Sequence, residues 1–327
     1  MLMIFILPLA DLIGYCTGCV SNPKPLPPST GSTLDECIRE ITLSAGFNNR
    51  DSQKFQQTLR ILQNIGEVKY NRVPRLQNTR ETANKYVFAS DDPVFPCAEA
   101  LYQGDIILEK FQMDSTVRNG LQYAELTEAD LNAAGENYPF EGSGAGEGGQ
   151  FPQRKKRSGD THESEENRGS LRTKRKLTHD SFRLWQMPIT YKLSIPALRS
   201  PVTLAIQHLQ RRTCIKFQET TDDIANIRGN YIIFINGRGC YSNVGKKIER
   251  EAQTISIGET CRSPGNALHE IGHALGLWHE QARPDRDDAV RVKDANIEDK
   301  YLGEFLIQGF NEVDISIPYD YGSIMHY

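Results

Sequence analysis

The spacing of apolar positions changes from one region of the chain to the next. Over 54–65 apolar residues recur at intervals of three or four, which predicts an amphipathic helix. The segment 189–193 alternates between apolar and polar residues and predicts a strand. Short apolar runs at 231–235 and 254–257 are typical of buried strands. The strands are therefore expected in the second half of the chain.

The same half also predicts two helices. Ser200 followed by Pro201 is typical of an N-cap and a first helical residue, and apolar side chains then recur on one face. A later helix turns Leu268, Ile271 and Leu275 toward a core. Helices and strands grouped in this way indicate an α+β domain.

Candidate chemistry is concentrated in the segment HEIGHALGLWH, which begins at His269. His269 and His273 lie four residues apart, so one face of a helix presents both to a single metal ion. Gly276 lets the backbone turn, so that His279 can return as a third nitrogen ligand. Three neutral imidazoles leave one tetrahedral position of a zinc ion open for water, as in catalytic sites. Glu270 is placed to take a proton from that water as general base.

A bare H-E-x-x-H also occurs by chance on helices whose histidines are merely solvated. Here the glycine and the third histidine stand at matching offsets, and S-I-M-H-Y follows near the C-terminus. Together with the run EQARPDRD after the third histidine, these residues resemble the astacin family of metzincin metalloproteases. The similarity is strong over about 176–327. It implies an α+β, metzincin-like catalytic domain with a twisted sheet, a zinc-binding helix and zinc endopeptidase activity.

The resemblance assigns roles to individual residues. It implies that His269, His273 and His279 bind one Zn²⁺ and that Glu270 is the general base. Tyr327 is implied as an additional zinc ligand, which leaves the metal and helps stabilise the tetrahedral intermediate.

Further roles implied by the resemblance are structural. Met325 forms an apolar floor beneath the zinc, and Glu280 is a buried carboxylate that pairs with the N-terminus exposed by activation. A protein or peptide substrate pairs with an edge strand near Tyr241 and Ser242.

Upstream, Tyr102-Gln103-Gly104-Asp105 resembles the aromatic-x-G-D motif of the family's pro-segment. In that motif the aspartate replaces the catalytic water on zinc and holds the enzyme inactive, so Asp105 is the expected latch. A carboxylate is a good zinc ligand, and the glycine lets the backbone approach the metal. The alternative is an ordinary turn, which G-D also marks.

Glycine and charged residues dominate 133–175, which indicates a flexible linker. Its two basic clusters, 154–157 and 172–175, fit the R-x-K-R pattern that furin-like convertases cut. Basic runs are also typical of solvated surface or anion-binding patches. A cut after Arg175 leaves Lys176 as the new N-terminus just ahead of the catalytic domain, so this is the expected activation site.

The N-terminal apolar run, interrupted by Asp11 and without a preceding basic residue, is typical of a signal peptide; a buried segment is the alternative. The run is too short to span a bilayer, and no later segment is long enough. The net charge is −4 with both signs mixed, so we expect no nucleic-acid partner. The sequence predicts a secreted, extracellular protein: signal peptide 1–18, pro-segment 19–175 and catalytic domain 176–327.

Seven cysteines suit an oxidising compartment. By the resemblance, Cys240 and Cys261 form a disulfide, and Cys214 matches a cysteine whose partner lies beyond the methionine turn. Cys37 and Cys97 can pair with each other, or Cys97 can be free, because connectivity does not follow from sequence.

The family's domain continues past the methionine turn, so we expect the C-terminal part of the catalytic domain to be missing. An alternative function is therefore a catalytically silent secreted protein that binds zinc or a partner. A weaker alternative is a precursor that acts mainly as an inhibitor through its pro-segment. The intact Glu270 favours the protease, because a zinc site that only binds has no need of a base.

Overall fold

The computed structural model describes residues 34–72, 75–76, 97–141, 183–223, 226–227, 229–248, 252–310 and 312–326. The expected signal peptide, both basic clusters, Arg175, Lys176 and Tyr327 lie outside the described residues. Within the described part of the chain, no helix combines the length and the apolar character needed to cross a membrane.

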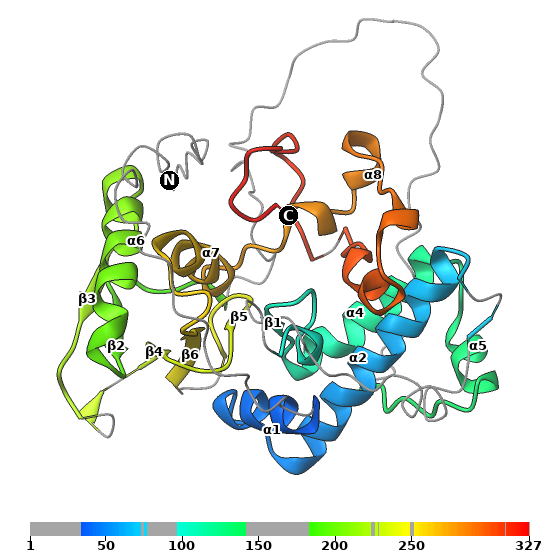
Figure 1. The fold of residues 1–327 in the computed structure, drawn as a ribbon, viewed down its shortest axis with the longest axis horizontal. Helices are drawn as coiled ribbons and strands as arrows, with labels where there is room; N and C mark the ends of the chain where they lie inside the picture. Colours follow the sequence, from blue (N-terminus) through cyan, green and yellow to red (C-terminus); the bar gives the residue numbers. More distant parts are fainter. Residues whose placement is uncertain are drawn as a thin grey trace, which may run out of the picture.

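The N-terminal region, residues 34–141, is mainly helical (Figure 1). The helix predicted over 54–65 is confirmed and extends further in both directions, as α2 (Asn49–Lys69). Asn48 caps α2 by accepting a hydrogen bond from the backbone N–H of Asp51 at 3.0 Å. The other elements of this region are α1 (Leu34–Ser44), η3 (Ala98–Ala100), β1 (Ile106–Ile107), α4 (Lys110–Tyr123) and α5 (Glu128–Ala133).

The C-terminal region, residues 183–326, combines a sheet with helices and confirms the expected α+β class. Two predicted strands coincide with β2 (Ile189–Leu193) and β4 (Tyr231–Ile235), and the third lies within β6 (Ala252–Ile257). The remaining elements are η5 (Pro196–Leu198), α6 (Arg199–Arg212), β3 (Phe217–Glu219), β5 (Cys240–Asn243), α7 (Pro264–Ala274), η7 (Glu280–Ala282), α8 (Arg286–Ala289), η8 (Asp294–Asn296) and η9 (Asp299–Phe305).

The sheet has six strands in the order β1-β5-β6-β4-β2-β3. Its pairs are parallel except for β5 with β6, so the sheet is mixed. The edge strand β1 comes from the N-terminal region and pairs with β5, with Ile106 opposite Ser242. In Figure 1 this pair lies between the rest of the sheet and the helices α2 and α4. The two regions are therefore joined by one sheet.

One hydrophobic core lies between the sheet and the helices α6 and α7. Ile271 of α7 is fully buried there, Leu275 is 8% exposed and Leu268 packs at its margin, which confirms the predicted apolar face. Trp185 Nε1 donates to the carbonyl of Ala274 at 2.7 Å. This packing orients α7 against the sheet.

A second core is shared by the two regions. It joins the N-terminal Phe55, Ile65 and Val117 to the C-terminal Trp278 and Leu306, all at most 5% exposed. Each large apolar side chain buried in this way contributes about 1.5–3 kcal/mol. The N-terminal region is therefore held by packing as well as by the strand pair.

The structure corrects two expectations. Ser200 is not an N-cap, because η5 runs directly into α6 and the cap position is Leu198, which makes no side-chain cap hydrogen bond. The linker does not begin at 133, because Tyr138 packs in the shared core and its hydroxyl lies 2.8 Å from Thr58 Oγ1. The backbone N–H of Glu141 donates a hydrogen bond to Asp114 Oδ2 in α4 at 2.8 Å. Composition alone missed these tertiary contacts.

The cysteine pairing is now defined for the described residues. Cys240 and Cys261 form the expected disulfide, and Cys37 pairs with Cys97, which decides between the two alternatives. Cys214 is exposed and pairs with none of the other described cysteines. The Cys37–Cys97 bond ties α1 to the segment that leads into β1.

Candidate active site

The helix α7 begins and ends with well-formed caps. Ser263 accepts a hydrogen bond from the backbone N–H of Asn266 at 3.0 Å, and proline follows at the first helical position. At the other end Gly276 has φ +102°, a conformation that glycine adopts without strain. The backbone N–H groups of Gly276 and Leu277 then donate to the carbonyls of His273 and Gly272, a Schellman motif. This turn redirects the chain toward His279.

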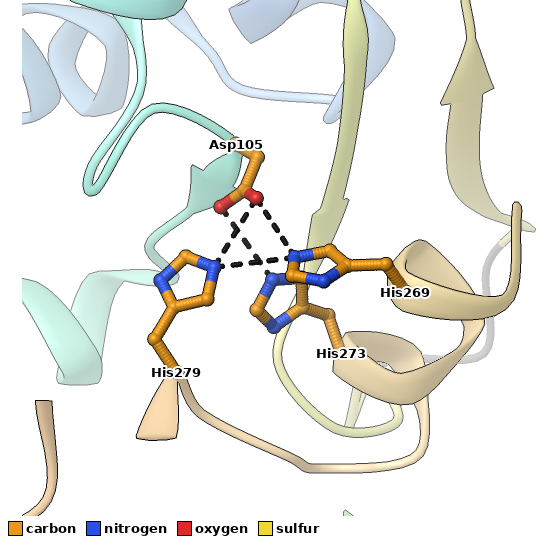
Figure 2. Close-up of side chains that lie close together, drawn as sticks. All are labelled: Asp105, His269, His273 and His279. Atoms are coloured by element: carbon orange, nitrogen blue, oxygen red, sulfur yellow. Dashed lines mark hydrogen bonds and ion pairs between the residues drawn. The ribbon is translucent and has the colours of Figure 1, made fainter. Parts of the chain in front are cut away.

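Figure 2 shows that the three histidines and Asp105 point toward one another. His269 Nε2 lies 3.2 Å from His279 Nε2 and 2.9 Å from Asp105 Oδ2. His279 Nε2 lies 3.2 Å from the same oxygen, and His273 Nε2 lies 3.5 Å from Asp105 Oδ1. His273 and His279 are fully buried, and the side chains of His269 and Asp105 are 13% exposed. The four ligand atoms lie within 4.8 Å of one another.

The second nitrogen of each ring defines its tautomer. Nδ1 of His269 lies 2.7 Å from the carbonyl oxygen of Ile324, and Nδ1 of His273 lies 2.8 Å from that of Leu277. Nδ1 of His279 lies 3.0 Å from the side-chain oxygen of Gln103. Such oxygens only accept hydrogen bonds, so each Nδ1 carries the proton. The three Nε2 atoms therefore direct lone pairs into the site.

This donor set fits a zinc ion. Zinc–ligand bonds of about 2.0–2.1 Å at tetrahedral angles separate the ligand atoms by about 3.3 Å, close to the 2.9–3.5 Å between the side chains. Within the described part of the chain, Nε2 of the buried His273 makes no hydrogen bond. Lone pairs and a carboxylate in such close contact repel one another unless a cation lies between them.

The acid–base properties of the site follow from burial and from Asp105. Burial lowers the pKa of His279 to about 4, which keeps this ring neutral. Burial raises the pKa of Asp105, but its electrostatic and hydrogen-bond contacts with His279, His273 and His269 outweigh this effect, so the pKa lies well below its usual value. Burial lowers the pKa of His269, but its hydrogen bond to Asp105 outweighs this and raises it.

Glu270 lies next to His269 on α7 and is 2% exposed. Among the described residues, its Oε2 has no hydrogen-bond partner. Burial, and then the Asp105 carboxylate, raise the pKa of Glu270 well above its usual value. A buried carboxyl group with an uncommitted oxygen is suited to accepting and returning a proton.

The methionine turn lies against α7. Met325 is 2% exposed, and its carbonyl accepts a hydrogen bond from the backbone N–H of Glu280 at 2.8 Å. The adjacent His326 is not part of the histidine cluster, and its Nε2 lies 2.8 Å from the hydroxyl of Tyr319. Tyr327, the expected additional ligand, lies outside the described residues.

Glu280 is buried, as expected, and its partners here are within the C-terminal region. Its Oε1 accepts a hydrogen bond from the backbone N–H of Asp320 at 2.7 Å and lies 3.3 Å from Arg283 Nη1. The guanidinium of Arg283 also donates to the carbonyl of Ile317. Glu280 and Arg283 therefore tie the segment after His279 to the segment before the methionine turn.

The expected substrate-binding strand is covered in this structure. The backbone N–H of Ser242 donates to the carbonyl of Asp105 at 3.0 Å, and Asn243 Nδ2 donates to the carbonyl of Ile107 at 3.0 Å. The edge near Tyr241 and Ser242 is thus paired with β1. Sequence reasoning located this edge and Asp105 separately, but no sequence signal placed one against the other.

Sequence reasoning missed Gln103. It occupies the unspecified position of the aromatic-x-G-D motif, so only its place beside Asp105 could have drawn attention to it. In the structure it is fully buried and contacts His279.

Comparison with known proteins points to one family. Residues 177–327 match the family model of astacin, a family of peptidases. The chain is 42% identical over 161 residues to the zinc metalloproteinase nas-34 of Caenorhabditis elegans, a match that covers 48% of this chain and 26% of that protein. It is also 42% identical over 165 residues to the zinc metalloproteinase dpy-31 of the same species, covering 49% and 27%.

Among solved structures, the chain is similar to high choriolytic enzyme 1, a hatching enzyme zinc-protease from Oryzias latipes, with 33% identity and a TM-score of 0.37. That match covers 45% of this chain and 70% of the other. The chain spans about a quarter of the length of the curated relatives it matches. The residues that match the astacin family model, 177–327, contain the three histidines, Glu270 and the methionine turn.

Proposed function

We propose that the chain is the precursor of a secreted zinc endopeptidase that hydrolyses peptide bonds in proteins. The observation that carries the proposal is the convergence of three Nε2 lone pairs beside a buried glutamate. His269, His273 and His279 are the proposed zinc ligands, and Glu270 is the proposed general base. The match of residues 177–327 to the astacin family model and the disulfides support a zinc-dependent enzyme of an oxidising, extracellular compartment.

A zinc ion in this site supplies Lewis acidity, which polarises a peptide carbonyl and makes water more acidic. Glu270 accepts a proton from the attacking water and delivers it to the nitrogen of the leaving amine. A buried carboxylate with a raised pKa holds the transferred proton more readily than an exposed one does. Tyr327 donates a hydrogen bond to the developing oxyanion.

Asp105 is the proposed latch of this precursor. Its carboxylate lies among the histidines, where it occupies the position that a water needs. Its backbone is paired with Ser242, so the strand that would bind substrate is covered as well. We propose that residues 19–175 form the pro-segment, and that a furin-like convertase cuts after Arg175 to free Lys176. Glu280 is then available to the new N-terminus once it exchanges its present partners.

The proposal is tested by peptide hydrolysis with the purified precursor before and after convertase treatment. Glu270→Gln is the matched variant, because it preserves size and loses the base. Activity that appears only after cleavage near Arg175, and is absent from Glu270→Gln with unchanged zinc content, supports the latent protease. Zinc bound without turnover in the cleaved wild type favours the second candidate, a catalytically silent secreted protein that binds zinc or a partner.

A further inference from the structure

We propose that Gln103 is a positioning residue through which the N-terminal region holds His279 in its metal-binding tautomer, separately from the direct contact of Asp105. This inference rests on the proposed zinc site. One short turn then acts on the metal site in two ways. The Asp105 carboxylate lies among the proposed ligands, and the Gln103 amide accepts a hydrogen bond from one of them, His279.

The contact is direct and buried. Gln103 is fully buried, and its Oε1 accepts the hydrogen of His279 Nδ1 at 3.0 Å. His269 and His273 take their Nδ1 acceptors, the carbonyls of Ile324 and Leu277, from the C-terminal region itself. The acceptor of His279 comes from the N-terminal region, across the interface.

The orientation of the Gln103 amide is fixed by its other end. Its Nε2 lies 3.1 Å from the hydroxyl of Tyr102 and 3.3 Å from the carbonyl oxygen of Leu306. A carbonyl oxygen only accepts, so the NH₂ group must be the end that faces Leu306. The oxygen therefore faces His279. This assignment of the amide in turn requires the proton on His279 Nδ1 and leaves Nε2 free to bind a cation.

The backbone explains how one turn delivers both groups. Gln103 has φ +49° and Gly104 has φ +80°, so two successive residues are left-handed. Tyr102 and Ile106 close the turn by exchanging backbone hydrogen bonds of 2.9 Å. The turn brings the side chain of Gln103 to Nδ1 of His279 and the carboxylate of Asp105 to Nε2 of the same ring.

The turn is anchored in the shared core. Tyr102 is 2% exposed and packs edge-to-face with Trp278 at 6.4 Å between ring centroids. Its hydroxyl accepts a hydrogen bond from Gln308 Nε2 at 2.7 Å. The phenol and the amide therefore form one buried chain of hydrogen bonds, from Gln308 to His279, that a rigid core holds in place.

Loss of an outer hydrogen-bond partner of a metal-bound histidine typically weakens metal binding 10–100-fold. We therefore expect Gln103→Met, which keeps the length but not the acceptor, to lower the zinc affinity of the uncleaved precursor by about this factor. Gln103→Glu keeps an acceptor for His279, loses the donor and adds a negative charge that also favours a bound cation, so it restores most of the affinity. Gln112→Met is the matched control, because Gln112 is also buried and donates to the carbonyl of Val244 across the same interface without contacting a histidine.

The experiment is a zinc competition titration of the uncleaved precursor against a chromogenic chelator, with thermal melting to establish that each variant is folded. The inference is supported if Gln103→Met loses at least tenfold in affinity, while Gln112→Met stays within about threefold of wild type and Gln103→Glu recovers. It is overturned if folded Gln103→Met binds zinc as tightly as wild type, or if Gln112→Met loses as much.

Should Gln103→Met fail to fold, Gln103→Glu decides the question alone. Affinity near that of wild type despite a lower melting temperature supports the acceptor role, and a tenfold loss contradicts it. A wild-type precursor that binds no zinc would instead refute the proposed zinc site itself. The two failures are thus distinguishable.

Discussion

Met325 packs so closely against Gly272 that a side chain at this helix position would force its neighbours to move. A Cβ on Gly272 would lie 2.8 Å from Met325 Sδ, below the distance that real Cβ atoms show. Gly272 directly precedes His273 in α7, so this contact sets how closely α7 and the methionine turn approach. Met325 therefore packs against the helix α7.

We predict that Gly272→Ala destabilises the protein. Overpacking costs about 1–3 kcal/mol, and the better helix propensity of alanine offsets at most about 1 kcal/mol of it. Gly265→Ala in the same helix is the control, because its Cβ would meet nothing closer than Ser263 Oγ at 3.8 Å. Thermal melting of both variants checks the prediction. Equal melting temperatures for the two would contradict the packing argument.

Replacement of Asp105 should release part of the latency without cleavage. Asp105→Ala removes the carboxylate from the histidine cluster but leaves β1 paired with β5, so substrate access stays restricted. We expect measurable peptide hydrolysis by the uncut variant, below that of the cleaved wild type. Asp105→Glu, which keeps the charge, serves as comparison. If the uncut Asp105→Ala variant shows no peptide hydrolysis while the cleaved wild type is active, the pairing of β1 with β5 is enough to maintain latency.

Removal of the Cys37–Cys97 disulfide should loosen the turn that carries Asp105. The bond closes a separation of 60 residues, and loss of such a cross-link typically costs about 2–4 kcal/mol. The double variant Cys37→Ser/Cys97→Ser should melt earlier and lose zinc to chelator sooner. Cys214→Ser is the control, since this cysteine is exposed and pairs with none of the other described cysteines. If the double variant and the control have the same melting temperature and lose zinc at the same rate, the disulfide does not support the latch.

Metal removal should lower the stability of the precursor. A ligand that binds only the folded state at a thousand times its dissociation constant stabilises by about 4 kcal/mol, and chelation removes that gain. The melting temperature should fall on chelation and return with added Zn²⁺. Glu270→Gln should keep this response, whereas His273→Gln, which loses a fully buried ligand, should lose most of it. A wild-type melt insensitive to chelator would exclude a tightly bound metal.

Local spacing in the sequence was enough to predict the strands at 189–193 and 231–235, the helix around 54–65 and the histidine-bearing helix. These features depend on periodicity and on caps within a few residues, where backbone geometry leaves little choice. The offset of four between His269 and His273, and the glycine at position 276, determine locally that three imidazoles can meet.

The sequence pointed to Asp105 only through its resemblance to the family's motif, and the tertiary structure decided which distant residues meet at the site. Asp105 lies 164 positions from His269, and Gln103 lies 176 positions from His279. The packing of Tyr138, the strand β1 and the Cys37–Cys97 bond likewise join residues far apart in the chain. Such contacts depend on how whole elements bury their apolar faces together. The residues around Gln103 in the sequence give no indication that its amide contacts a histidine.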